Sequence, residues 1–369
     1  MLASTLAAGW VSWRIGLRCA RQQSRRPAIA FVVVWSAVAC TLGLSEWALR
    51  STSMNDNFRN LAAFGHERSP ILGFEQRANH LWEQEGVRMS TDARRFRNRP
   101  IDAPDSPITV ASIAVVGGSS AFGFGLDDSQ TWPALLERRL RAHGRAIRVI
   151  NAANQGHNSY QTLIRTYLRV LPLKPDWVLF YGSRNDLGSQ RLPPTGAFFP
   201  AEAAPWSTHE FLDHRYPEKN LYYRSLLVFI AHSAFRGQFG GTDWYPLHEP
   251  TEPRSMHEVL VANAATYVRN LRTLLDTCRR AGVQPVLATF LFDEDRAQGP
   301  FARGLLLNNE QLAKVAHEEG VPLIDLATEF KSVEGKQDYF FDDAYHPNAR
   351  GAAWIAASVA AHFERWTAR

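Results

Sequence analysis

The chain has 369 residues, of which 45% are hydrophobic and 21% charged, and this composition excludes a disordered or fibrous protein. Its net charge of +5 is carried by five arginines in an acid-free segment before residue 28: Arg14, Arg18, Arg21, Arg25 and Arg26. Because the rest of the chain is balanced, the basic charge is local, and we expect no nucleic-acid partner.

The first predicted element is a membrane helix over residues 28–49. An uncharged run follows the arginines and continues, apart from Glu46, as far as Leu49. Its length is at the short end of what crosses the hydrocarbon core of a bilayer. The positive-inside rule then places residues 1–27 in the cytoplasm as a basic segment and the chain after about residue 50 on the outer side of the cytoplasmic membrane. A cleaved signal peptide and a buried core helix remain as alternatives.

Residues 50–107 are predicted to form a stalk or lead-in to the domain that follows. They are polar and rich in arginine, and they lack strong helical or strand periodicity. Pro70, Pro100 and Pro104 would interrupt any long element in this stretch.

From residue 108 onward, short apolar strands alternate with helical segments. The expected strands cover residues 108–116, 147–151, 177–181, 285–291 and 322–326, and the expected helices cover residues 131–143, 159–173, 256–281, 305–319 and 352–366. The strands are apolar on both faces, which is typical of a parallel sheet covered by helices on both sides. Residues 108–369 are therefore predicted to form a three-layer α/β/α sandwich, of the α/β class.

The alternation stops over residues 187–255, which are rich in proline and aromatic residues. A long irregular insertion of this kind is typical of a lid or a substrate-binding excursion. Its aromatic side chains would suit stacking on sugar rings, but the packing residues of a small subdomain would have the same composition.

A hydroxyl group suited to nucleophilic attack lies in the glycine-rich turn of residues 117–123. Ser119 stands just after the first strand, at the end where open parallel sheets place their ligand crevices, and the glycines let the backbone turn tightly. An ordinary strand-to-helix turn would have the same sequence. A phosphate-binding loop is disfavoured, because residues 117–125 contain no lysine and lack the glycine spacing of dinucleotide sites.

Two further blocks supply hydrogen-bond donors at the ends of the next two strands. In residues 151–156, Gly156 would present its backbone N–H to an oxyanion without a side chain in the way. In residues 182–186, Asn185 would donate from its neutral side-chain amide. A simple turn in the first block, and capping of the next segment by Asn185 or Asp186 in the second, are the alternatives.

The last block offers a base. His346 precedes Pro347, which rules out a regular helix there, and Asp343 can hold the Nδ1–H of the imidazole while Nε2 faces Ser119. A single histidine is more often structural, but three blocks at consecutive strand ends leave only the base to be supplied. In combination the four blocks predict the nucleophile, oxyanion hole, base and orienting carboxylate of an acyl-transferring serine enzyme.

These blocks resemble those of the SGNH or GDSL-type hydrolases, which occur in the same order, and the resemblance extends over about residues 108 to 365. It implies a flavodoxin-like parallel sheet within the three-layer sandwich. It also implies the site roles: Ser119 as nucleophile, His346 as base, Asp343 as its partner, and the N–H groups of Ser119 and Gly156 together with Asn185 as the oxyanion hole.

The sequence departs from the pattern of this family at two places. Gly118 stands where an aspartate usually precedes the serine, and Ser183 and Arg184 lie between the glycine and the asparagine of the third block. The first departure leaves the predicted triad intact, because Asp343 orients the base. In this respect the chain is more similar to membrane-anchored bacterial members, in which a segment like residues 71–74 (Ile-Leu-Gly-Phe) precedes the hydrolase domain.

The residues and the resemblance together predict a serine esterase that acts through an acyl-enzyme on a small-molecule or glycan ester, with O-acylated envelope or exported glycans favoured by a location outside the membrane. No cofactor and no metal are expected: the histidines lack ligand spacing, and the only cysteines are Cys19, Cys40 and Cys278. Two alternatives stay open, an O-acyltransferase acting on a polysaccharide through the same site and a non-catalytic polysaccharide-binding or assembly protein with the same fold.

Overall fold

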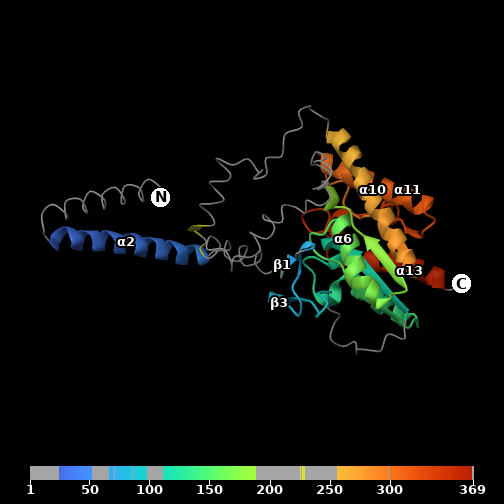
Figure 1. The fold of residues 1–369 in the computed structure, drawn as a ribbon, viewed down its shortest axis with the longest axis horizontal. Helices are drawn as coiled ribbons and strands as arrows, with labels where there is room; N and C mark the ends of the chain where they lie inside the picture. The colour runs from blue at the N-terminus through green and yellow to red at the C-terminus, as the bar shows by residue number, and fades with distance from the viewer. Residues whose placement is uncertain are drawn as a thin grey trace. The chain divides into compact units, whose positions relative to one another are not determined.

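The computed structural model describes residues 25–51, 66–69, 71–84, 86–97, 111–187, 225, 227–228, 256–297 and 299–367. The chain divides into two compact units, the first comprising Met1–Ala63 and Asp213–Trp244 and the second Phe64–Leu212 and Tyr245–Arg369 (Figure 1). Nearly all of the insertion predicted over residues 187–255 lies outside the described residues, as does the segment before Arg25.

In the first unit, helix α2 (Arg25–Arg50) is long and apolar enough to cross a membrane. Its 26 residues give a length of roughly 39 Å, and the stretch Ile29–Arg50 has a mean hydropathy of 1.8. Large apolar side chains such as Val32 and Trp47 are exposed, so no part of the described chain covers them as a core would. The helix is a candidate membrane span, and a signal sequence would have the same properties.

The second unit is built on a five-stranded parallel sheet with the strand order β6-β5-β7-β8-β9. The strands are β5 (Ala111–Gly117), β6 (Ile147–Asn151), β7 (Trp177–Tyr181), β8 (Gln284–Ala288) and β9 (Leu323–Ile324). Because β5 lies between β6 and β7, the loops that follow these three strands leave the sheet side by side.

Helices cover both faces of this sheet. They are α4 (Ser119–Phe122), α5 (Trp132–Ala142), α6 (Ser159–Arg165), α10 (Met256–Arg280), α11 (Gly299–Glu318), α12 (Leu326–Phe330) and α13 (Ala349–Thr367), with short 3-10 turns at Asp128–Gln130 and Lys336–Tyr339. Ile113 and Val115 of β5 belong to one buried cluster with residues of α5 and α13, whereas Ala114 and Val116 belong to a second cluster with residues of α10. This alternation confirms the predicted α/β/α sandwich.

Several predicted elements have different bounds in the structure; the helix expected over residues 305–319, for example, is α11 and begins at Gly299. Two elements end early for a clear reason. The helix expected over residues 159–173 continues from α6 only as a π-helical turn (Thr166–Val170) and a 3-10 turn (Leu171–Leu173), because Pro172 has no N–H for a helical hydrogen bond. The strand expected over residues 285–291 ends at Ala288. Beyond it the Phe290 N–H donates to the side chain of Asn309 at 2.7 Å rather than to a neighbouring strand.

Two hairpins precede the sheet, formed by β1 (His66–Ser69) with β2 (Gly73–Gln76) and by β3 (Leu81–Gln84) with β4 (Val87–Ser90). They belong to the same compact unit as the sheet, and Gln161 of α6 donates to the carbonyl oxygen of Leu72, between β1 and β2, at 2.7 Å. The described part of the expected lead-in is therefore packed structure and not a stalk. This stretch lacks apolar periodicity because many of its contacts with the rest of the unit are hydrogen bonds and ion pairs.

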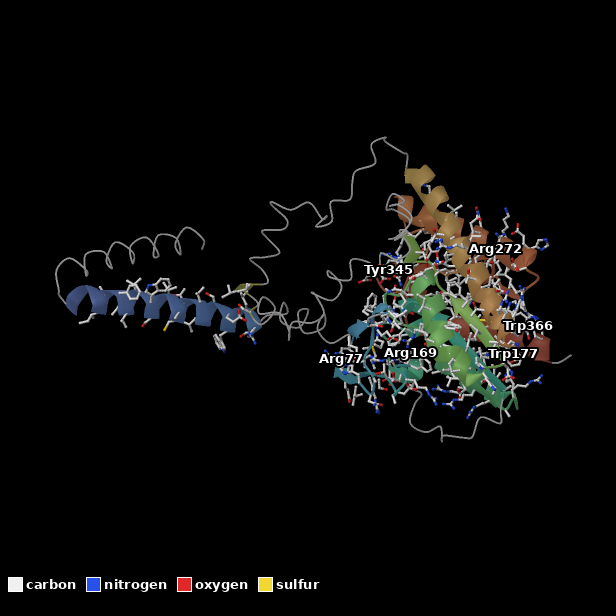
Figure 2. All side chains as sticks on the ribbon, viewed as in Figure 1. Arg77, Arg169, Trp177, Arg272, Tyr345 and Trp366 are labelled. Carbon is white, nitrogen blue, oxygen red and sulfur yellow. The ribbon has the colours of Figure 1, made fainter. Side chains whose placement is uncertain are left out.

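A cluster of charged side chains joins the hairpin of β1 and β2 to α6 and to the π-helical turn that follows it. The Glu75 carboxylate accepts hydrogen bonds from Arg165 at 2.7 Å and from Arg169, labelled in Figure 2, at 2.6 Å. Burial raises the pKa of Glu75, but the hydrogen bond from Arg169 and the charges of both arginines outweigh it and hold this pKa below its ordinary value. Arg165 also donates to the carbonyl oxygens of Ala152 and Arg95, so the cluster joins β2 to the loop after β6.

Candidate active site

Ser119 is the first residue of α4 and follows β5 through two glycines. Gly117 has φ 151°, and a Cβ there would lie 1.9 Å from the carbonyl oxygen of Tyr181 on the neighbouring strand β7. Only glycine allows the backbone to leave the sheet at this point. The turn places the half-buried Ser119 hydroxyl at the carboxyl end of the sheet.

The structure brings Ser119, His346 and Asp343 into one chain of contacts. His346 Nε2 lies 2.6 Å from Ser119 Oγ, and His346 Nδ1 lies 2.5 Å from Asp343 Oδ2. An ionised carboxylate only accepts hydrogen bonds, so Nδ1 carries the proton and Nε2 accepts from the Ser119 hydroxyl. This is the tautomer in which the imidazole can take a proton from the serine.

Asp343 is held by the backbone of its own loop. Its Oδ1 accepts the N–H of His346 at 2.9 Å and that of Tyr345 at 3.1 Å, in a turn where Ala344 has the left-handed φ of 67°. Burial raises the pKa of Asp343, but the hydrogen bond and charge of His346 and the two backbone N–H groups outweigh it and lower the pKa below its ordinary value. The Asp343 carboxyl group is therefore ionised at neutral pH.

Neighbouring side chains fix the position of the imidazole ring. Phe124 stacks on His346 with ring centroids 4.5 Å apart and an interplanar angle of 29°. The hydroxyl of Ser120 donates to the carbonyl oxygen of Tyr345 at 3.1 Å, which ties the loop of the base to the helix of the nucleophile.

The second and third blocks meet the first at Gly118. The Asn185 Nδ2 donates to the carbonyl oxygen of His157 at 2.8 Å, and a Cβ on Gly118 would lie 2.6 Å from this nitrogen. An amide nitrogen carries two hydrogens, so one of them stays available to a ligand. Gly156 adopts φ 79°, and within the described residues neither its N–H nor that of Ser119 donates a hydrogen bond. The unusual Gly118 thus makes room for the Asn185 amide.

Replacing Gly118 by alanine is expected to displace the Asn185 amide and lower kcat by about 100-fold to 1000-fold, the loss that follows removal of one oxyanion donor. Asn185→Ala should lose as much, and the double variant should lose no more than either alone, because both remove the same donor. Steady-state kinetics of the three variants tests this. Gly182→Ala is the matched control, since a Cβ there has no neighbour closer than 3.4 Å, and it should keep the wild-type rate.

The two residues inserted in the third block have structural partners. The Ser183 hydroxyl accepts from Asn308 of α11 at 3.0 Å. The Arg184 guanidinium lies over the ring of Tyr345, labelled in Figure 2, at 4.6 Å from the centroid. These contacts join the loop that carries Asn185 to α11 on one side and to the loop that carries His346 on the other.

Two buried residues that support the site were not predicted as site residues. His157 carries the carbonyl that binds Asn185, and its position beside Gly156 was the available signal. Asp186 accepts the N–H of Ser159 at 3.0 Å and its hydroxyl at 2.5 Å, at the first turn of α6. Asp186 thus binds the start of α6, which precedes it in the chain, whereas the next segment, which the alternative has it cap, lies outside the described residues beyond Leu187. Burial raises the pKa of Asp186 to about 6 despite these hydrogen bonds.

The raised pKa of Asp186 predicts a pH-dependent stability. In the unfolded chain this carboxyl ionises near its ordinary pKa of 3.8, so its stabilising contribution is fully present below that pH and is lost as the pH rises through about 6. Between about pH 4 and pH 7, the free energy of unfolding of the wild type should fall by about 2 kcal/mol more than that of Asp186→Asn. Urea unfolding of the detergent-solubilised chain at both pH values measures this, and equal pH effects in the two proteins would contradict it.

Among the described residues, no group of three or more histidine, cysteine, aspartate or glutamate side chains is arranged to hold a metal ion. The parts assembled at the edge of the sheet are instead a hydroxyl, an imidazole, a carboxylate and nearby amide donors. A parallel α/β/α fold with such a group at its carboxyl edge defines a serine hydrolase.

The chain belongs to the GDSL-like lipase/acylhydrolase family, whose model matches residues 115–354. It is similar to esterase TesA of Pseudomonas aeruginosa, with 39% identity over 75 residues, which span 20% of this chain and 37% of that protein. Among solved structures it is similar to a lipase/acylhydrolase from Enterococcus faecalis (18% identity, 68% of this chain and 94% of that chain, TM-score 0.43) and to the acetyl xylan esterase AlAXEase (15% identity, 70% and 98%, TM-score 0.42).

Proposed function

We propose that this protein is a serine esterase that hydrolyses acyl esters through a covalent acyl-enzyme. The observation that carries the proposal is the contact chain from Ser119 Oγ to His346 Nε2 and from His346 Nδ1 to Asp343, in a chain of the GDSL-like acylhydrolase family. A serine hydroxyl is a weak nucleophile at its free pKa, and an adjacent, oriented imidazole activates it.

In the proposed first step, His346 Nε2 takes the Ser119 proton while Oγ bonds to the ester carbonyl carbon. The carbonyl oxygen becomes an oxyanion, which accepts hydrogen bonds from the Ser119 and Gly156 N–H groups and from the second hydrogen of Asn185. The bond to the alcohol oxygen then breaks, and His346 returns the proton to the leaving alcohol. Asp343 stabilises the imidazolium in between.

In the proposed second step, His346 takes a proton from water, and the resulting hydroxide oxygen bonds to the acyl carbon. Collapse of this intermediate releases the carboxylic acid and restores the Ser119 hydroxyl with the proton held by His346. Each oxyanion donor is worth about 100-fold to 1000-fold in rate.

We further propose that the ester is carried by a glycan on the outer side of the cytoplasmic membrane. The arginines that precede the apolar span Ile29–Arg50 support this orientation, because positively charged flanks stay in the cytoplasm. Protease digestion of spheroplasts tests the location, since the hydrolase domain should be cleaved while the outer leaflet is the only face exposed.

The full chain, purified in detergent, is assayed for nitrophenol release from nitrophenyl acetate and for labelling by a fluorophosphonate. The proposal predicts turnover, stoichiometric labelling and, in mass spectrometry of quenched enzyme, one acyl group on the peptide that contains Ser119. Turnover that rises when an oligosaccharide is added, with the acyl group recovered on the sugar, would favour acyl transfer over hydrolysis. A folded chain that neither labels nor turns over would favour a binding or assembly role.

A further inference from the structure

The hairpin of β1 and β2 contacts the second block at every residue around Gly156. Gln76 N donates to Asn154 Oδ1 at 2.9 Å, and His66 Nε2 lies 3.3 Å from the carbonyl oxygen of Gln155. His157 Nε2 donates to the carbonyl oxygen of Phe74 at 2.8 Å. Gly156 is thus flanked on both sides by residues that the hairpin holds.

One of these contacts continues to Asn185. The imidazole of His157 donates to the Phe74 carbonyl, and the backbone carbonyl of the same His157 accepts the Asn185 amide at 2.8 Å. His157 is 2% exposed, and Phe74 is fully buried with its ring edge-on to the imidazole at 5.2 Å. A residue packed this tightly has little freedom to move its own carbonyl.

The hydrogen bonding and the pKa of His157 suit a residue that holds its neighbours in place and not one that transfers protons. Its Nε2–H donates to the Phe74 carbonyl, and Nδ1 is buried without a hydrogen-bond partner among the residues that the structure describes. Burial, followed by the charge of Arg165, lowers the pKa of His157 to about 3, so the ring stays neutral across the range in which the enzyme would work.

We infer that the β1–β2 hairpin is a working part of the active site, in which His157 is a positioning residue that transmits the place of Phe74 to the two oxyanion donors, Gly156 and Asn185. This inference rests on the proposed esterase mechanism. The hairpin lies outside residues 115–354, the part of the chain that matches the family model. The contacts that the hairpin makes around Gly156 therefore come from residues that the family model does not cover.

The test compares His157→Leu, which fills the space but cannot donate to Phe74, with His157→Gln, whose side-chain nitrogen can. In nitrophenyl acetate hydrolysis by the full chain in detergent, His157→Leu should lower kcat by about 10-fold to 100-fold with KM within about twofold, since a shifted donor costs less than a missing one. His157→Gln should restore most of the rate. His362→Leu, which removes a 2.6 Å contact with Glu329 between α13 and α12, is the control and should keep the wild-type kcat.

The decisive measurement repeats His157→Leu in the Asn185→Ala background. If His157 acts through Asn185 and Gly156, the combined loss should be clearly smaller than the product of the two single losses, whereas a general weakening of the fold would multiply them. A folded His157→Leu protein with wild-type kcat, or fully multiplicative losses, would overturn the inference. If His157→Leu does not fold, His66→Leu replaces it, because it loses the contact on the other side of Gly156. A wild type without any turnover would overturn the proposed function itself, and this inference with it.

Discussion

Ser119→Ala is expected to abolish ester hydrolysis, with a fall in kcat on the order of 10⁶-fold, as when the nucleophile of a Ser-His-Asp site is removed. His346 would keep its hydrogen bond to Asp343 and its stacking on Phe124, so the base would remain in place without a group to activate. Fluorophosphonate labelling and nitrophenol release should disappear together. The melting temperature should hardly change, because a half-buried hydroxyl with one hydrogen bond contributes about 1 kcal/mol.

The adjacent serine provides the matched control. Ser120 is buried and donates to the carbonyl of Tyr345, so Ser120→Ala removes a hydroxyl one residue away without touching the imidazole. This variant should still be labelled by the probe and should lose no more than about tenfold in rate, from a slightly less ordered loop at His346. Labelling that survives in Ser119→Ala and vanishes in Ser120→Ala would reverse the assignment of the nucleophile.

Asp343→Asn is expected to lower kcat by about 10⁴-fold while the fold is kept. The asparagine oxygen would continue to accept the backbone N–H groups of Tyr345 and His346, which leaves its NH₂ group facing Nδ1 of the imidazole. Nδ1 must then accept, so the proton moves to Nε2, and Nε2 can no longer take the proton of Ser119.

The neighbouring Asp342 is exposed and offers the same change of charge one residue away. Asp342→Asn should retain close to the wild-type kcat, which separates loss of the orienting carboxylate from a general loss of negative charge near the base. Measuring kcat and KM for both variants across pH distinguishes the cases. A rate for Asp343→Asn within about tenfold of the wild type would show that another group orients His346.

The architecture could be predicted because its signals are local. Strands such as Trp177–Tyr181 are apolar on both faces. The glycines around Gly117 indicate a tight turn, and Gly117 has a positive φ in the structure. Asn185, which lies beside Gly118 next to Ser119, could also be found, since Ser119 and Asn185 each follow a strand of one parallel sheet and such strands end at a common edge. The same reasoning predicts that Gly156 lies at this edge. The contact of His346 with Ser119 could be predicted because only one further loop, the one that carries His346, had to lie at the same edge.

The hairpins and their support of the second block could not be predicted from the sequence. Their contacts are single hydrogen bonds between residues far apart in the chain, such as that of Gln161 with the Leu72 carbonyl at 2.7 Å, and such bonds leave no periodic pattern. Residues 66–97 therefore looked like an irregular, polar linker. The role of Gly118 could not be predicted either, because a glycine in place of an aspartate does not indicate that the Asn185 side chain occupies the space of its missing Cβ.

The packing of the hairpins decides where a soluble fragment of this protein must begin. A fragment that starts at the first residue of the family match, Val115, would cut into β5 and leave the partners of Phe74 and Glu75 uncovered. Starting at residue 108 would keep the strand but would remove Glu75 and the Arg95 carbonyl, two of the partners of the buried Arg165. Expression vectors for crystallography or inhibitor screening should therefore begin before His66, even though no catalytic motif lies there.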